Sequence, residues 1–268
     1  MANDGGLIAA APAGGEDVAV AGLRRLSGLA GLLLLVQAVV LGIILALAPA
    51  RVVLPITLGL PGGRERIVLF AVDIGAGVIV LAMLVAVSRL VVVMPTVFPH
   101  YCSGVLSNRH TARWIEFLFS SSITLFLVAQ LNGISDIGAL VLSYAITGGM
   151  TLFSVLQERS VRSTSGRMLP LWFGAAIGIV PWGVIAFHQV AALVMGQPPS
   201  ALARVVTLTM LAFAFAFFVS HWRDQRRSDS VPSALAGERT HILLSLASTS
   251  VFAWLVAFGV LGVGNVRL

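Results

Sequence analysis

The sequence predicts an all-α membrane protein, a single bundle of seven transmembrane helices, and three observations lead to this fold class. Apolar residues make up 58% of the 268 positions and charged residues only 10%, whereas soluble domains are about half apolar and about a quarter charged. The mean hydropathy is +0.98. The apolar residues also gather into seven windows of about 20 residues, which is the length that a helix needs to cross a bilayer.

The predicted spans follow one another through short connections, and no segment has the composition of a separate soluble domain. The first window contains no charge and exceeds the apolar core of about 7–15 residues of a signal peptide, so we interpret it as a retained span. We expect residues 1–23 to form a flexible cytoplasmic tail and residues 24–268 to form one membrane domain. The expected spans are 26–48, 67–93, 112–132, 137–157, 168–196, 202–222 and 240–263.

A β-hairpin is expected between the first two spans. Residues 52–58 and 64–68 are rich in β-branched side chains, and they flank the turn sequence Pro61-Gly62-Gly63. Two such runs around a Gly- and Pro-containing turn are typical of a hairpin. We therefore expect residues 51–66 to form an external hairpin loop. The last cytoplasmic connection, residues 223–238, is polar and is expected to be a mobile loop.

The arginines indicate how the chain is oriented. All 17 basic residues are arginines, and most of them precede the first span or lie in connections on that same side of the membrane. Cytoplasmic loops carry the excess of basic residues, so we expect a multi-pass protein of the cell membrane with a cytoplasmic N-terminus and an extracellular C-terminus. The arginines fall in short clusters beside apolar runs, which suits lipid headgroups. No nucleic-acid partner is expected.

Charged residues inside the spans are the first candidates for a functional site. Glu116 lies in the third span and shares a helix face with Ser120. Such a polar stripe points into the bundle as a rule, although serines also serve simply as contacts between helices. Arg89 lies in the second span at a depth similar to that of Glu116. Two interpretations stay open for it, a buried ion pair with Glu116 or a side chain that extends to the headgroups.

Aromatic residues on the last three spans suggest a second kind of site. The fifth span holds Trp172 and Trp182, the sixth has a run of phenylalanines that includes Phe215, and the seventh has Phe252 and Trp254. Aromatics at helical spacing often serve only packing. Rings from three helices at a middle depth would instead form a slot for a flat apolar ligand.

Metal, haem and enzyme chemistry find little support in the residue pattern. His188 lies alone in the fifth span, where it would be either a packing residue or an axial haem ligand. The other histidines and Cys102 map to the cytoplasmic side without a tight ligand spacing; they are His100, His110, His221 and His241. Hydrolase, phosphate-loop and metalloprotease motifs are absent. We expect no enzyme and no catalytic residue.

Three short motifs resemble the heliorhodopsin family. The strongest lies in the third span, where Arg113-Trp114-Ile115-Glu116-Phe117 is followed by Ser120-Ser121-Ser122 and then by Gln130-Leu131-Asn132-Gly133. Pro181-Trp182 and Phe252-Ala253-Trp254 are similar to the family in the fifth and last spans. The resemblance covers residues 24–263 and implies a rhodopsin-like seven-helix bundle.

The resemblance also implies roles for single residues. Glu116 would lie where the family keeps the counterion of its retinal Schiff base, and Thr249 where the family has its retinal-binding lysine. A hydroxyl cannot form an imine, so the resemblance implies a chain that cannot bind retinal covalently. Arg89 would then replace the Schiff base as the cation beside Glu116. The pocket-lining residues would be Ser120, Ser121, Trp182, Phe215, Phe252 and Trp254.

Several functions remain open at this point. The first is a receptor-like or scaffolding module that signals to a cytoplasmic partner. The second is a modified photoreceptor or binding protein that holds retinal, a carotenoid or another isoprenoid without a covalent bond, and the third is a haem- or metal-binding membrane protein. A transporter is disfavoured because no chain of buried carboxylates crosses the spans. The resemblance further implies a homodimer in the lipid bilayer.

Overall fold

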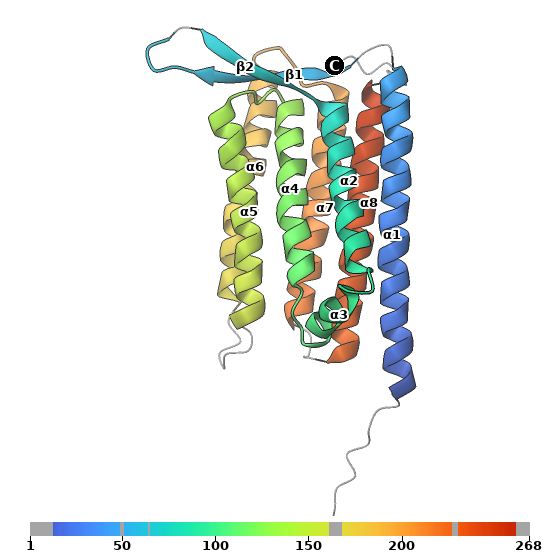
Figure 1. The fold of residues 1–268 in the computed structure, drawn as a ribbon. Coiled ribbons are helices and arrows are strands. Elements are labelled where there is room, and N and C mark those ends of the chain that lie inside the picture. The colour runs from blue at the N-terminus through green and yellow to red at the C-terminus, as the bar shows by residue number, and fades with distance from the viewer. Residues whose placement is uncertain (1–12, 49–50, 64, 161–167, 227–229, 261–268) are drawn as a thin grey trace, which may run out of the picture.

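The computed structural model describes residues 13–48, 51–63, 65–160, 168–226 and 230–260. Long helices stand side by side as one bundle, and each of the seven is long and apolar enough to cross a membrane (Figure 1). The predicted seven-helix, rhodopsin-like fold class is thereby confirmed. The long helices are α1 (Ala13–Leu47), α2 (Ile74–Val92), α4 (Thr111–Leu131), α5 (Ile137–Ser160), α6 (Leu169–Val194), α7 (Ala201–Arg226) and α8 (Val231–Val260).

A two-stranded antiparallel hairpin follows the first helix, as the sequence predicted. Strands β1 (Val53–Gly59) and β2 (Arg66–Asp73) lie across one end of the bundle (Figure 1). Ile56 is fully buried beneath the hairpin. The Thr57 amide donates to the carbonyl of Ser135 over 2.8 Å, so the connection between α4 and α5 holds the hairpin in place. The predicted hairpin residue Arg64 lies outside the described residues.

The first helix is longer than expected. α1 begins at Ala13, so residues 13–23 are helical and are not the flexible tail that the sequence suggested. Leu23 is completely buried, and Arg239 of α8 donates to the carbonyl of Ala19 over 2.8 Å. Three of residues 13–23 are glycines, which disfavour helix, so the contacts with α8 hold the segment in this conformation. Residues 1–12, the rest of the expected tail, lie outside the described residues.

The last helix also begins earlier than expected. The segment 223–238 was expected to be a mobile loop, but α7 continues to Arg226 and α8 starts at Val231. Pro232 is compatible with this start because the first turn of a helix does not need its N–H. Glu238 is fully buried although the segment is polar. Residues 227–229 and 261–263 lie outside the described residues.

A short helix, α3 (Phe98–Leu106), was not expected from the sequence. It lies at the end of the bundle opposite the hairpin and connects α2 to α4 (Figure 1). Pro99 occupies its first turn, where proline is tolerated. Tyr101 and Val105 are buried and pack in a cluster with Leu23 of α1 and Ile242 of α8. The helix therefore closes this end of the bundle over the charged residues described next.

Candidate functional site

An ion pair between α2 and α4 occupies the interior of the bundle. Arg89 Nη2 donates to Glu116 Oε2 over 2.6 Å, and both side chains are almost completely buried. Two groups of α8 approach the same carboxylate: His241 Nε2 lies 3.2 Å from Oε2, and the Ser245 hydroxyl donates to Oε1 over 3.0 Å. Of the two interpretations of Arg89, the structure has the buried pair, and side chains of two other helices, α2 and α8, hold Glu116 of α4.

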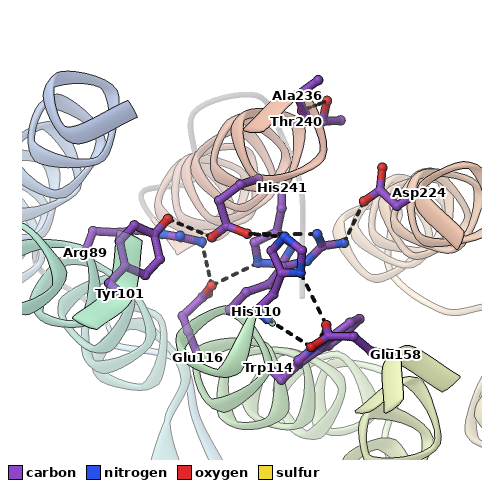
Figure 2. Close-up of polar contacts among 12 residues, drawn as sticks. Arg89, Tyr101, His110, Trp114, Glu116, Glu158, Asp224, Ala236, Thr240 and His241 are labelled. Carbon is purple, nitrogen blue, oxygen red and sulfur yellow. Dashed lines mark hydrogen bonds and ion pairs between the residues drawn. The ribbon is translucent and has the colours of Figure 1, made fainter. Parts of the chain in front are cut away.

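A second group of charged contacts joins α3, α4, α7 and α8 (Figure 2). Tyr101 donates to Glu238 Oε1 over 2.9 Å, and Arg113 donates to Asp224 of α7 over 3.0 Å. Arg113 Nη1 also lies 4.0 Å from Glu238 Oε2. Burial, and next the carboxylate of Glu238, raise the pKa of Tyr101 above its ordinary value, so this hydroxyl keeps its proton.

Glu158 ties the fifth helix into the same set of contacts. Its carboxylate accepts hydrogen bonds from the His110 backbone amide over 3.0 Å and from the Trp114 indole N–H. His110 Nδ1 lies 3.3 Å from Glu158 Oε2. We call the whole set the ionic network; its members are Arg89, Tyr101, His110, Arg113, Trp114, Glu116, Glu158, Asp224, Glu238, His241 and Ser245. It links α2, α3, α4, α5, α7 and α8.

A cavity of about 380 Å³ lies beside the ionic network. We call it the central cavity; side chains from α4, α5, α6, α7 and α8 line it. Its wall is mainly apolar and aromatic, with Trp182 of α6 and Phe217 of α7 among the rings. A hydroxyl-bearing side contains Ser120 of α4 and Ser245 and Thr249 of α8. This mixture of an apolar wall and a few polar groups is typical of small-molecule sites.

The central cavity opens between α6 and α7. Among its lining residues, Trp172 is 52% exposed, Ile179 58% and Phe215 66%, and these three belong to α6 or α7. The residues contributed by α8 are all buried. Both helices are candidate membrane spans, so the opening faces the region that lipid chains would occupy. An apolar molecule dissolved in the bilayer would reach the cavity from the side.

The predicted pocket residues fall into two groups. Ser120, Ser121, Trp182 and Phe215 line the central cavity, and so does Thr249. Phe252 and Trp254 do not: Phe252 is fully buried in the close-packed core, and Trp254 packs beside Phe258 with ring centroids 5.7 Å apart. Trp254 is nine residues beyond Ser245, which is half a turn out of phase on a helix of 3.6 residues per turn.

The histidines that the structure describes are not grouped as the ligands of a metal ion are. No group of three or more His, Cys, Asp or Glu side chains in the described part of the chain could hold a metal ion. His188 is exposed, and its ring bonds to the carbonyl of Val184 in the same helix over 3.0 Å. His221 and His241 stack at 6.0 Å beside Phe117. Cys102 is partly exposed, and burial raises the pKa of its thiol.

Sequence reasoning missed most of the ionic network. Tyr101 and Glu238 lay in segments that were interpreted as connections, and His241 was expected only as one of the histidines on the cytoplasmic side. The spacing on α8 was the available signal, because His241, Ser245 and Thr249 recur every four residues and therefore share a face. The residues on α2 and α4 that these side chains contact cannot be recognised from the spacing on α8 alone.

Comparison with known protein families matches this architecture. The family model for heliorhodopsins aligns with residues 23–261, which is most of the chain. The chain belongs to the heliorhodopsin family. No curated protein matches the sequence. This heliorhodopsin contains no lysine at any position, so no side chain lining the central cavity carries a primary amine. The donor set of the cavity, hydroxyls and imidazole, therefore does not fit a covalently bound aldehyde.

Proposed function

We propose that this heliorhodopsin is a receptor-like membrane protein that holds an apolar ligand of the isoprenoid type, such as retinal or a carotenoid fragment, without a covalent bond. The observation that carries the proposal is the central cavity. Its volume of about 380 Å³ lies within the usual range of ligand sites. Its aromatic wall suits a flat, conjugated molecule, and its lateral opening suits a ligand delivered from the bilayer.

The polar side of the central cavity would fix the orientation of such a ligand. His221 lines the cavity, and its Nε2 has no hydrogen-bond partner among the described residues. Thr249 and Ser120 also face the cavity. A ligand with one hydroxyl or carbonyl end would place that end here and its hydrocarbon body against Trp182. Buried polar groups favour a ligand that satisfies their hydrogen bonds.

The ionic network gives ligand binding a route to the end of the bundle. Ser245 lines the central cavity and also donates to Glu116. Arg89 and His241 both contact Glu116. Glu238 and Tyr101 form a second group of contacts nearer α3, and the charges of Arg89 and His241 act on Glu238 through space. A ligand that moves Ser245 would alter the hydrogen bonding of Glu116. We infer that occupancy is reported to a cytoplasmic partner through this route, with the α3 end facing the cytoplasm because the arginines concentrate there.

The remaining expectations are part of the same proposal. The arginine distribution supports a cytoplasmic N-terminus, and the homodimer in the cell membrane rests on the family resemblance alone. A purely scaffolding role would leave the central cavity without a use, so we prefer the binding function. Haem or metal binding has less support, since His188 is exposed and hydrogen-bonded within its own helix. No arrangement in the site favours an enzyme.

Ligand titration of the full chain in lipid nanodiscs tests the proposal. All-trans-retinal and retinol are added, and quenching of the total tryptophan emission is followed; Trp172 and Trp182, two of the five tryptophans, line the cavity. We expect saturable binding of one ligand per chain. Ala214→Phe fills the cavity, and overpacking of this kind costs at least about 1 kcal/mol. The dissociation constant should therefore rise at least about fivefold. Ala212→Phe, on the exposed face of α7, is the matched control. Binding that is absent, or equal in both variants, would refute the proposal.

A further inference from the structure

A second hollow lies outside the central cavity, between α4 and α5. It has a volume of about 550 Å³, and we call it the α4–α5 groove. Its apolar part is formed by Ile115 and Leu118 of α4 and by Leu152 and Val155 of α5. Ile115 and Leu152 are both more than half exposed. The groove therefore runs along the surface of two membrane spans, at the level of lipid chains.

Two arginines lie at one end of the α4–α5 groove. Arg109 precedes α4 and Arg159 is in the last turn of α5, so both are at the boundary of the apolar spans. Both side chains are exposed. Among the ion pairs of the described residues, neither guanidinium has a carboxylate partner. Two guanidiniums above an apolar groove match the layout of an anionic lipid, with its phosphate at the interface and its chains below.

The acidic residue in the groove offsets one of these two positive charges and leaves the groove with a net positive charge. Glu158 also lines the α4–α5 groove, but its two oxygens already accept hydrogen bonds from His110 and Trp114. The Thr111 hydroxyl lies at the same end as the arginines and supplies a further donor. The arginines concentrate on this side of the bundle, and the cytoplasmic leaflet carries the anionic lipids that attract them.

We propose that the α4–α5 groove binds one anionic phospholipid of the bilayer, with its phosphate between Arg109 and Arg159 and an acyl chain along Ile115 and Leu152. Bound lipid would cover the α4–α5 face and contact Trp114 and Glu158, which belong to the ionic network. The site is separate from the central cavity, and the proposal does not depend on a ligand there.

Native mass spectrometry of the full chain tests this site. The protein is released from nanodiscs that contain equal amounts of phosphatidylcholine and phosphatidylglycerol, and retained lipids are counted. We expect each chain to retain one phosphatidylglycerol molecule in preference to phosphatidylcholine. The double variant Arg109→Gln/Arg159→Gln should lower this retention about 25-fold, or about fivefold for each arginine. Leu152→Trp, which fills the groove without removing charge, should lower it as well.

Control variants distinguish lipid binding at the α4–α5 groove from a general attraction of anionic lipid to exposed arginines. Arg66→Gln/Arg204→Gln removes the same charge from exposed arginines outside the groove and should leave retention unchanged. Equal loss in both double variants, or no loss in either, would overturn the proposal. Displacement of the lipid by millimolar inorganic phosphate would also overturn it, since the groove would then recognise an anion alone. Disulfide cross-linking of two copies through Ile115→Cys in a Cys102→Ser background would overturn it in favour of a second copy.

Discussion

Arg89 Nη2 lies 2.6 Å from Glu116 Oε2, and this buried pair joins α2 to α4 in the interior of the bundle. His241 and Ser245 of α8 complete the surroundings of the carboxylate. Taking a lone carboxylate out of water is strongly unfavourable, whereas a hydrogen-bonded pair is tolerated. We infer that Arg89 takes the place of the cationic Schiff base that a chain without lysine cannot form.

Replacing Arg89 by Gln should destabilise the bundle. The substitution leaves the buried Glu116 carboxylate without its cation, which typically costs about 3–5 kcal/mol. Unfolding of the purified protein in mixed micelles by a strong detergent measures the change. The double variant Arg89→Gln/Glu116→Gln should recover most of the loss because two neutral amides replace the pair. Arg66→Gln, an exposed arginine of the hairpin, is the control, and equal stability of R89Q and R66Q would contradict the account.

Tyr101→Phe should remove stability in a pH-dependent manner. The variant leaves Glu238 Oε1 without its donor, at a cost of about 1–3 kcal/mol. Burial, and next the Glu238 carboxylate, raise the pKa of Tyr101 above its ordinary value near 10. The contribution is therefore fully present below about pH 10 and is lost above it, where the unfolded chain releases the proton. Unfolding curves of wild type and Y101F should converge above about pH 10; a constant difference would exclude this linkage. Tyr144→Phe is the control.

Ile56→Ala tests whether the hairpin is a structural part of the bundle. Ile56 is fully buried in the main core, so its truncation should cost about 2–5 kcal/mol. Val68→Ala on β2, where the side chain is 60% exposed, should change stability by less than about 0.5 kcal/mol. Thermal unfolding measures both variants. Similar melting temperatures for the two would show that the hairpin folds independently of the helices.

Thr249→Lys should create a covalent attachment point. Thr249 is buried, lines the central cavity and lies one turn from Ser245, which binds Glu116. An amine here would meet the aldehyde of bound all-trans-retinal with a carboxylate nearby. We expect T249K to give a coloured pigment and Thr249→Met, a side chain of similar length without an amine, to give none. A folded T249K protein that stays colourless with retinal would place residue 249 outside the ligand site.

The sequence was sufficient for the architecture because hydropathy and turn composition act locally. The spans follow from apolar windows, and the hairpin from Pro61-Gly62-Gly63 between β-prone runs. Segment 230–238 was misjudged for a physical reason. Glu238 looks like a loop residue by composition, but it is buried once Tyr101 and Arg113 supply partners from α3 and α4. Composition does not show which distant groups will pair.

The site was only partly predictable for the same reason. Comparing depths along two antiparallel spans was enough to suggest the Arg89–Glu116 pair. Trp254 was expected in the pocket although it lies half a turn from Ser245 on α8, and Phe252, which shares the face of Ser245, lies about two turns further along the helix. The structure places Phe252 in the core and Trp254 beside Phe258. Which face of a helix meets a cavity depends on packing with neighbours, and one helix pattern cannot determine it.

The central claim, that the cavity holds an isoprenoid without a covalent bond, is tested most directly by intact-mass measurement of the full chain. The protein is saturated with all-trans-retinal, as judged by tryptophan quenching, and is then treated with borohydride to fix any imine. The account predicts saturation with an unchanged polypeptide mass. A retinyl adduct on the polypeptide, or no saturable quenching at all, would contradict it.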